Sequence, residues 1–169
     1  MPDIVRRYVG FIDRVNHVVG LFAMYLIVAM IGILLYSSVM KAVAIPPLWT
    51  LEMAQFVMAA YYMLGGGWSL QNDAHVRMDL LYSRWRPRTR AMIDTATILF
   101  LIFYLGVMLY GGFSSTAYAI RYGETSYSSW SPYMAPVKII MCIGIALMLL
   151  QAFAQFFRDL ALARGEELP

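Results

Sequence analysis

Charged side chains are scarce in this sequence. Asp, Glu, Lys and Arg make up 14% of the 169 residues, whereas 61% of the residues are hydrophobic. A soluble globular domain carries about 25% charged residues, so a soluble fold is not expected. The mean hydropathy of +0.63 agrees with that conclusion.

Cysteine and histidine are scarce too, which limits the chemistry open to the chain. Cys142 is the only cysteine, so one chain can build neither a disulfide framework nor a thiolate metal site. His17 and His75 flank long uncharged stretches, so neither can ligate a haem at mid-membrane. His75 and Asp79 could touch on one helix face, but catalysis or metal binding would need a further reactive group or ligand. The sequence therefore predicts no catalytic residue, no metal and no cofactor.

What the sequence does contain is four long stretches with almost no charge. A helix needs about 20 apolar residues to cross a hydrocarbon core about 30 Å thick. We predict four membrane-spanning helices at about residues 18–40, 51–70, 92–118 and 136–157. The first is longer than a signal peptide and no small-residue cleavage site follows it, so we expect it to be retained. The connecting segments are short, so residues 1–169 are expected to form a single all-α integral membrane domain.

Basic residues predict the orientation of these helices. Ten of the thirteen Lys and Arg residues fall before the first span, between the second and third, or after the fourth; Lys41, Arg121 and Lys138 fall on the opposite side. Because basic residues favour the cytoplasm, both termini are expected to be cytoplasmic. This topology and anionic headgroups explain the net charge of +3, so no nucleic-acid partner is expected.

A short amphipathic helix is predicted at about residues 73–86. Its apolar side chains, including Met78, Leu81 and Tyr82, fall within about 100° on a helical wheel, with arginines on both flanks. This pattern is typical of a helix that lies along the cytoplasmic headgroups. The residues expected to contact phospholipid headgroups are Arg77, Arg84, Trp85, Arg86 and Arg88.

The second predicted span carries a stripe of small and polar residues. Steps of three and four residues connect Glu52, Gln55, Ala59, Tyr62, Gly66 and Ser69. In lipid, small residues allow close helix contact and polar residues share hydrogen bonds, so the stripe is expected to face protein. Packing within the chain, a partner interface, or a substrate or ion path are all compatible with it. The glycines at 65–67 lack the Lys-Ser/Thr of a phosphate loop and indicate close packing, and Thr50 is the expected N-cap.

The segment between the third and fourth spans is unusually aromatic. Tyr127, Trp130 and Tyr133 suit either a belt at the membrane interface or a surface that docks another protein.

The predicted spans carry no charge near mid-membrane. Ion-coupled carriers usually place ionisable groups or discontinuous helices at that depth. The chain is therefore expected to be a scaffold for a partner rather than a carrier.

Several short motifs carry a family resemblance. Trp49-Thr50-Leu51-Glu52, the glycines that follow, and Ala74-His75-Val76-Arg77-Met78-Asp79 resemble the small membrane subunit of tripartite ATP-independent periplasmic (TRAP) transporters, the DctQ-like family. The outer segment, from Glu124 through Trp130 to Lys138, is similar to the branch associated with mannitol, chloroaromatic or keto-acid uptake. One departure is the Gln71-Asn72-Asp73-Ala74 turn, where many relatives have a shorter, glycine-containing turn.

The resemblance implies partners and a location. It implies a bacterial inner-membrane protein that works with a large elevator-type membrane subunit, which carries substrate with sodium, and with a periplasmic substrate-binding protein. The small subunit is expected to brace the large one and to help dock the binding protein. The expected partner-subunit interface comprises Trp49, Glu52, Gln55, Ala59, Tyr62, Gly66, His75 and Asp79.

Two other functions differ in how well they fit the sequence. A four-helix membrane anchor for a redox or other enzyme complex would show the same spans. A membrane-embedded hydrolase would need a reactive constellation that the sequence does not offer.

Overall fold

The computed structural model describes residues 3–43, 45, 47–72 and 87–163. These residues form four α-helices: α1 (Asp3–Val43), α2 (Thr50–Gln71), α4 (Pro87–Tyr122) and α5 (Ala135–Ala163). The predicted all-α architecture is confirmed for this part of the chain. The predicted interfacial helix at 73–86 lies outside the described residues.

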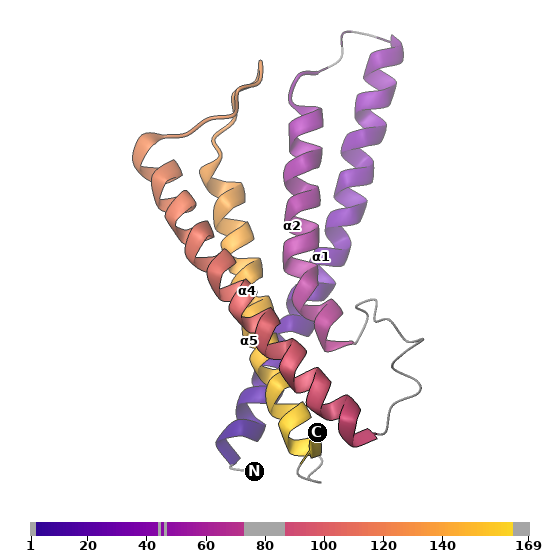
Figure 1. Ribbon diagram of the computed structural model, residues 1–169. Helices are drawn as coiled ribbons and strands as arrows, with labels where there is room; N and C mark the ends of the chain where they lie inside the picture. Colours follow the sequence, from indigo (N-terminus) through magenta and orange to yellow (C-terminus); the bar gives the residue numbers. More distant parts are fainter. Residues whose placement is uncertain (1–2, 44, 46, 73–86, 164–169) are drawn as a thin grey trace.

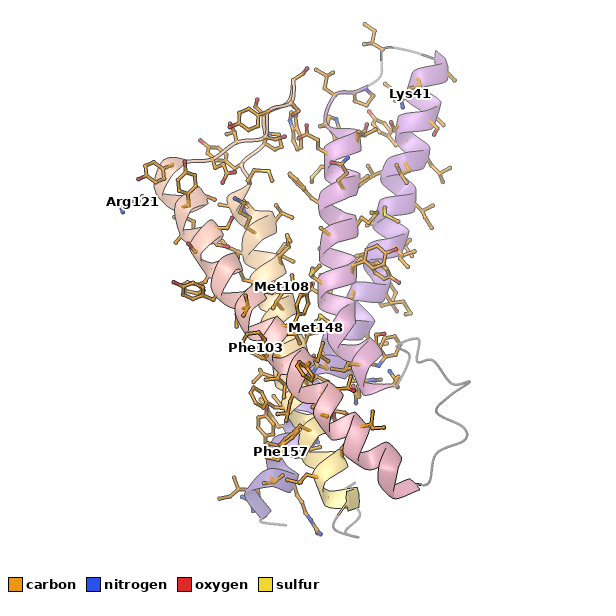
Figure 2. The ribbon with its side chains drawn as sticks, in the orientation of Figure 1. Lys41, Phe103, Met108, Arg121, Met148 and Phe157 are labelled. Carbon is orange, nitrogen blue, oxygen red and sulfur yellow. The ribbon has the colours of Figure 1, made fainter. Side chains whose placement is uncertain are left out.

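The helices form two antiparallel hairpins, α1 with α2 and α4 with α5 (Figure 1). Both hairpin loops lie at one end of the bundle, and α1 begins and α5 ends at the other. We call these the loop end and the terminus end. The hairpins meet where α2 packs on α5 and diverge towards the loop end. Lys41 and Arg121 both lie at the loop end (Figure 2), on one side as the sequence predicts.

Three helices are long and apolar enough to cross a membrane within the described residues: Ile4–Val43, Ala96–Tyr122 and Ala135–Ala161. α2 is long enough, with 22 residues, but it is not among them. Glu52, Gln55 and the glycines at 65–67 lower its hydropathy. By length and apolar composition, the structure thus supports three of the four predicted spans. The membrane crossing of α2 stays a prediction, as does the cytoplasmic placement of the termini.

The first helix is much longer than predicted. α1 has 41 residues, or about 61 Å at 1.5 Å per residue, which is about twice the hydrocarbon thickness. Its first turns are helical because Val9, Ile12 and Asn16 recur at helical spacing and are buried. Val9 and Ile12 pack against Ala154 and Phe157 of α5. Residue 18 was the predicted start because the uncharged stretch begins there. Packing against α5 extends the helix from that residue towards the N-terminus.

Glycines allow α2 and α5 to approach closely. A Cβ at Gly144 would lie 2.6 Å from the backbone carbonyl of Met63, and a Cβ at Gly66 would overlap Met148. Beside this crossing, Leu70, Leu105 and Ile145 form a buried cluster, and Figure 2 shows Met108 and Met148 where the hairpins meet. The close packing predicted for the glycine run is confirmed for Gly66, and Gly67 packs likewise against Asn16 of α1.

The start of α2 differs from the prediction. The helix begins at Thr50, with Trp49 in the N-cap position and no side-chain cap. The Thr50 hydroxyl instead lies 3.0 Å from that of Ser37 and 3.1 Å from the carbonyl oxygen of Pro47. The predicted capping role of Thr50 was wrong because its side chain is buried against α1, where it links the two helices.

Gly144→Ala should force α2 and α5 apart, because the added methyl group meets backbone that cannot rotate away. We expect a loss of about 1 to 3 kcal/mol, the usual cost of overpacking, measured by thermal unfolding in detergent micelles. Gly106→Ala is the matched control, because a Cβ there meets nothing within 4 Å. Equal melting temperatures for the two variants would contradict the close contact.

Candidate functional site

The half of α2 that lies towards the loop end, which we call its upper half, holds the carboxylate of Glu52. This carboxylate has no partner in the described part of the chain. One carboxylate oxygen of Glu52, Oε2, is inaccessible to solvent and accepts no hydrogen bond. Trp49, just before the helix, stacks on Tyr36 of α1 with ring centroids 5.9 Å apart. Glu52 thus follows Trp49 by about one helical turn, and one of its two carboxylate oxygens is buried without a partner.

The predicted stripe on α2 is not uniformly covered. Gln55 and Tyr62 are exposed, and they share one face of the helix with the exposed Leu51 and Met58. Ala59 and Gly66 are half-buried, and Gly66 touches Met148 of α5. The stripe therefore follows the border between the α5-facing side of α2 and its uncovered face.

The other motif and headgroup residues are not placed by the structure. His75, Asp79, Arg77, Arg84, Trp85 and Arg86 lie outside the described residues. Arg88 falls in the first turn of α4, and its side chain is also outside them. Their predicted roles stay predictions.

The loop between α4 and α5 is held in a defined shape. Lys138 Nζ lies 2.5 Å from Glu124 Oε2, and Thr125 and Tyr133 form an antiparallel bridge. Two backbone bonds, Ser126 N–H to the Pro132 carbonyl and Met134 N–H to the Glu124 carbonyl, are each 3.0 Å long. The loop thus forms a short, cross-linked finger at the loop end of the bundle.

The aromatic side chains of this finger point outward. Tyr127 is completely exposed, Tyr133 is 67% exposed and Trp130 is 39% exposed. Ser131 adopts a positive φ of 46°, which non-glycine residues rarely do. Its hydroxyl donates to the Ser128 carbonyl oxygen at 2.8 Å, which helps hold the turn that presents these rings.

A buried polar network ties α1 to α5 near the terminus end. Asn16 Nδ2 donates to Gln151 Oε1 at 2.6 Å, and Gln151 Nε2 donates to Asp13 Oδ1 at 2.9 Å. Asp13 also pairs with Arg158. Asn16 and Gln151 are fully buried. The sequence showed the polar character of Asn16 and Gln151, but their pairing depends on which helix faces meet.

A cavity of about 620 Å³ lies between α1 and α2. Gly20, Ala23 and Met24 of α1 and Met148 of α5 line it. The lining residues contributed by α2 are Tyr61, Tyr62, Gly65, Gly66, Trp68, Ser69 and Asn72. The cavity therefore includes Tyr62 and Gly66 of the predicted interface.

Three long apolar helices and a largely apolar exposed surface define an α-helical integral membrane protein. The chain belongs to the family described as tripartite ATP-independent periplasmic transporters, DctQ component, whose sequence model matches residues 30–162. No curated protein matches the chain. The family resemblance seen in the motifs is confirmed, and the match is to the family as a whole, so the branch stays a prediction.

Family membership settles the general role. The chain is the small membrane subunit of a TRAP transporter and a multi-pass protein of the inner membrane. Members of the family function with a large membrane subunit and a periplasmic binding protein, and the family is a transporter component rather than an enzyme family. This assignment favours transport over an anchor for a redox complex.

Asp13→Asn should loosen the terminus end, because it leaves the guanidinium of Arg158 without its anion. Asp13 and Arg158 are only 17% and 21% exposed, so we expect a loss of about 1.5 to 3 kcal/mol, typical of a hydrogen bond to a charged group. Thermal unfolding in micelles measures it, with Lys41→Gln at the other end as control. The exchanged pair Asp13→Arg with Arg158→Asp should recover part of the loss; no recovery would mean that the ion pair contributes little.

Proposed function

We propose that this subunit is a static brace for the large membrane subunit and that the upper half of α2 is its main contact. The observation that carries the proposal is the buried, unpartnered carboxylate oxygen of Glu52. The Glu52 side chain is half-buried, and only one of its oxygens is inaccessible; a buried acceptor without a donor costs about 1 to 3 kcal/mol. Because the Glu52 side chain as a whole is only half-buried, a Lys or Arg side chain of the large subunit can approach the carboxylate from its accessible side. Such a pair would offset part of that cost and fix the register of the two proteins.

The uncovered face of α2 supports the same contact. Gln55 is exposed between Leu51 and Met58, and an amide facing hydrocarbon would leave its donors and acceptor unsatisfied. A partner helix can supply hydrogen bonds there, as polar side chains do between membrane helices. Trp49 and Ala59 flank this region and complete the proposed contact.

This arrangement also explains the low hydropathy of α2. A helix of 22 residues spans about 33 Å, and α2 runs beside α1 over most of its length (Figure 1). We infer that α2 crosses the membrane as the fourth span, with both termini cytoplasmic. Covered by α1, α5 and the large subunit, it faces little lipid and needs less apolar surface than its neighbours.

The brace has to resist the movement of its partner. In an elevator mechanism one domain of the large subunit slides against a fixed one while it carries solute and sodium. The Asp13–Arg158 and Asn16–Gln151 contacts link α1 to α5, and the crossing at Gly144 links α2 to α5. These contacts join the two hairpins into one body. Organic-acid uptake coupled to sodium, which the resemblance implies, is part of this proposal.

The finger between α4 and α5 is the proposed dock for the periplasmic binding protein. Its position at the loop end, its cross-links and its exposed tyrosines support this role, because preorganised aromatic side chains bind at a small entropic cost. A belt at the membrane interface remains the alternative reading of the same residues.

Glu52→Gln tests the brace contact. The substitution keeps the shape of the side chain and removes its charge, so we expect at least about tenfold weaker association with the large subunit. Co-purification in mild detergent, followed by dissociation measured on dilution, reports the change. Glu124→Gln is the control, because it neutralises another carboxylate at the loop end; equal association of both variants would refute the contact at Glu52.

Alanine at Tyr127, Trp130 and Tyr133 together tests the dock. Uptake into vesicles should need a higher concentration of binding protein for half-maximal rate, because the aromatic contacts are lost, while the two membrane subunits stay associated. Tyr110→Ala is the control, since Tyr110 is 80% exposed on α4. Uptake kinetics unchanged from the parent protein would leave the membrane-interface belt as the role of these residues.

A further inference from the structure

We propose that the cavity between α1 and α2 binds one phospholipid with an anionic headgroup. The acyl chain would lie along α2 beside Gly65, and the phosphate would lie near Arg14 and His17. This proposal does not depend on the contact at Glu52, which lies more than two helical turns from the nearest lining residue of α2.

The cavity has the shape and chemistry of a site for a chain-like apolar group. Its α2 residues run from Tyr61 to Asn72, a rise of about 16 Å. Small residues, Gly20, Ala23 and Gly65, lie among the aromatic and methionine side chains that line it. Met24 and Tyr62 in its lining are exposed, so the cavity is open to the surface of the chain. A cavity this long fits an acyl chain aligned with the helices.

Polar and cationic groups gather at the terminus end of the cavity. Asn72 and Ser69 line it there, and the His17 ring contacts Trp68 with centroids 6.3 Å apart. Arg14 is exposed and lies one helical turn before His17, on the same side of α1. Within the described residues Arg14 has no anionic partner. A phosphate is the anion that a membrane supplies at this place.

The depth of these groups matches a lipid. Gly20, at the side of the cavity, lies just inside the uncharged stretch of α1, whereas Arg14 and His17 lie just before it. An amphiphile with its phosphate at Arg14 and its chain beside Gly20 and Met24 would therefore sit at the normal depth of one leaflet. If an apolar helix of a partner protein filled the cavity instead, Arg14 would still have no anion to pair with.

Tyr62 and Gly66 would then contribute to the predicted interface through the bound lipid. Both line the cavity, so the bound lipid, rather than these side chains alone, would present a surface to the large subunit.

Gly65→Leu tests whether the cavity is occupied. A Cβ at Gly65 meets only Ala23, at 4.0 Å, so a leucine can extend into the cavity without a backbone clash. Gly32→Leu is the matched control, since a Cβ there meets nothing within 4 Å. The chain with its large subunit is released from nanodiscs of equal phosphatidylglycerol and phosphatidylcholine, and retained lipid is counted by native mass spectrometry. We expect one retained phospholipid in the parent and in Gly32→Leu, and none in Gly65→Leu.

Arg14→Gln tests the headgroup. The preference for phosphatidylglycerol over phosphatidylcholine should fall about fivefold, the effect of one basic residue near a membrane surface. Arg121→Gln, at the loop end, should keep the preference. Equal retention of the two lipids by the parent protein would overturn the phosphate site.

Other outcomes also decide the matter. Undiminished lipid in Gly65→Leu would overturn the proposal, and loss of the large subunit with lipid retained would assign the cavity to a protein helix.

If Gly65→Leu fails to fold by circular dichroism, Tyr62→Ala decides alone, because it removes an exposed side of the cavity without adding volume. Lipid retention several-fold below the parent supports the site, and parent-like retention refutes it.

Discussion

The contact between α2 and α5 is the constraint on which the rest of the molecule depends. In a membrane no hydrophobic force drives helices together, so they associate through close packing and shared polar contacts. Gly66 and Gly144 bring the two backbones together, and this crossing joins the hairpins more extensively than the contact of α1 with α5 does. Because the hairpins diverge above it, the upper half of α2 is left with an uncovered face.

Polar side chains are bonded differently at the two ends of the bundle. Near the terminus end, hydrogen bonds and an ion pair link Asp13, Asn16, Gln151 and Arg158, although the buried Oδ1 of Asn16 has no partner in the described residues. Near the loop end, Glu52 has a buried oxygen with no partner in the described residues. A carboxylate oxygen that is buried and unpaired within the subunit suits a chain that works with a permanent partner. This fits the small subunit of a transporter better than a protein acting alone.

Much of the fold could be predicted, and the errors have a common cause. Hydropathy located the apolar parts of α1, α4 and α5, because a span of fixed thickness needs a fixed number of apolar residues. It missed the first turns of α1, which are stabilised by Val9 and Ile12 against α5, and it misassigned Thr50, whose hydroxyl faces α1. In each case a contact with another helix decided the outcome, and one-dimensional patterns do not contain such contacts.

The amino-acid sequence by itself determined the helical membrane class, the family motifs and the stripe on α2, because these follow from composition and local spacing. Only the tertiary structure decided which parts of that stripe are covered, that Gln151 meets Asp13 and Asn16, and that glycines on α1 and α2 leave a cavity beside Trp68. The physical reason is that burial and pairing depend on the rotation and crossing of whole helices. Those are set by packing between segments that lie far apart in the chain, as much as 138 residues for Gln151 and Asp13.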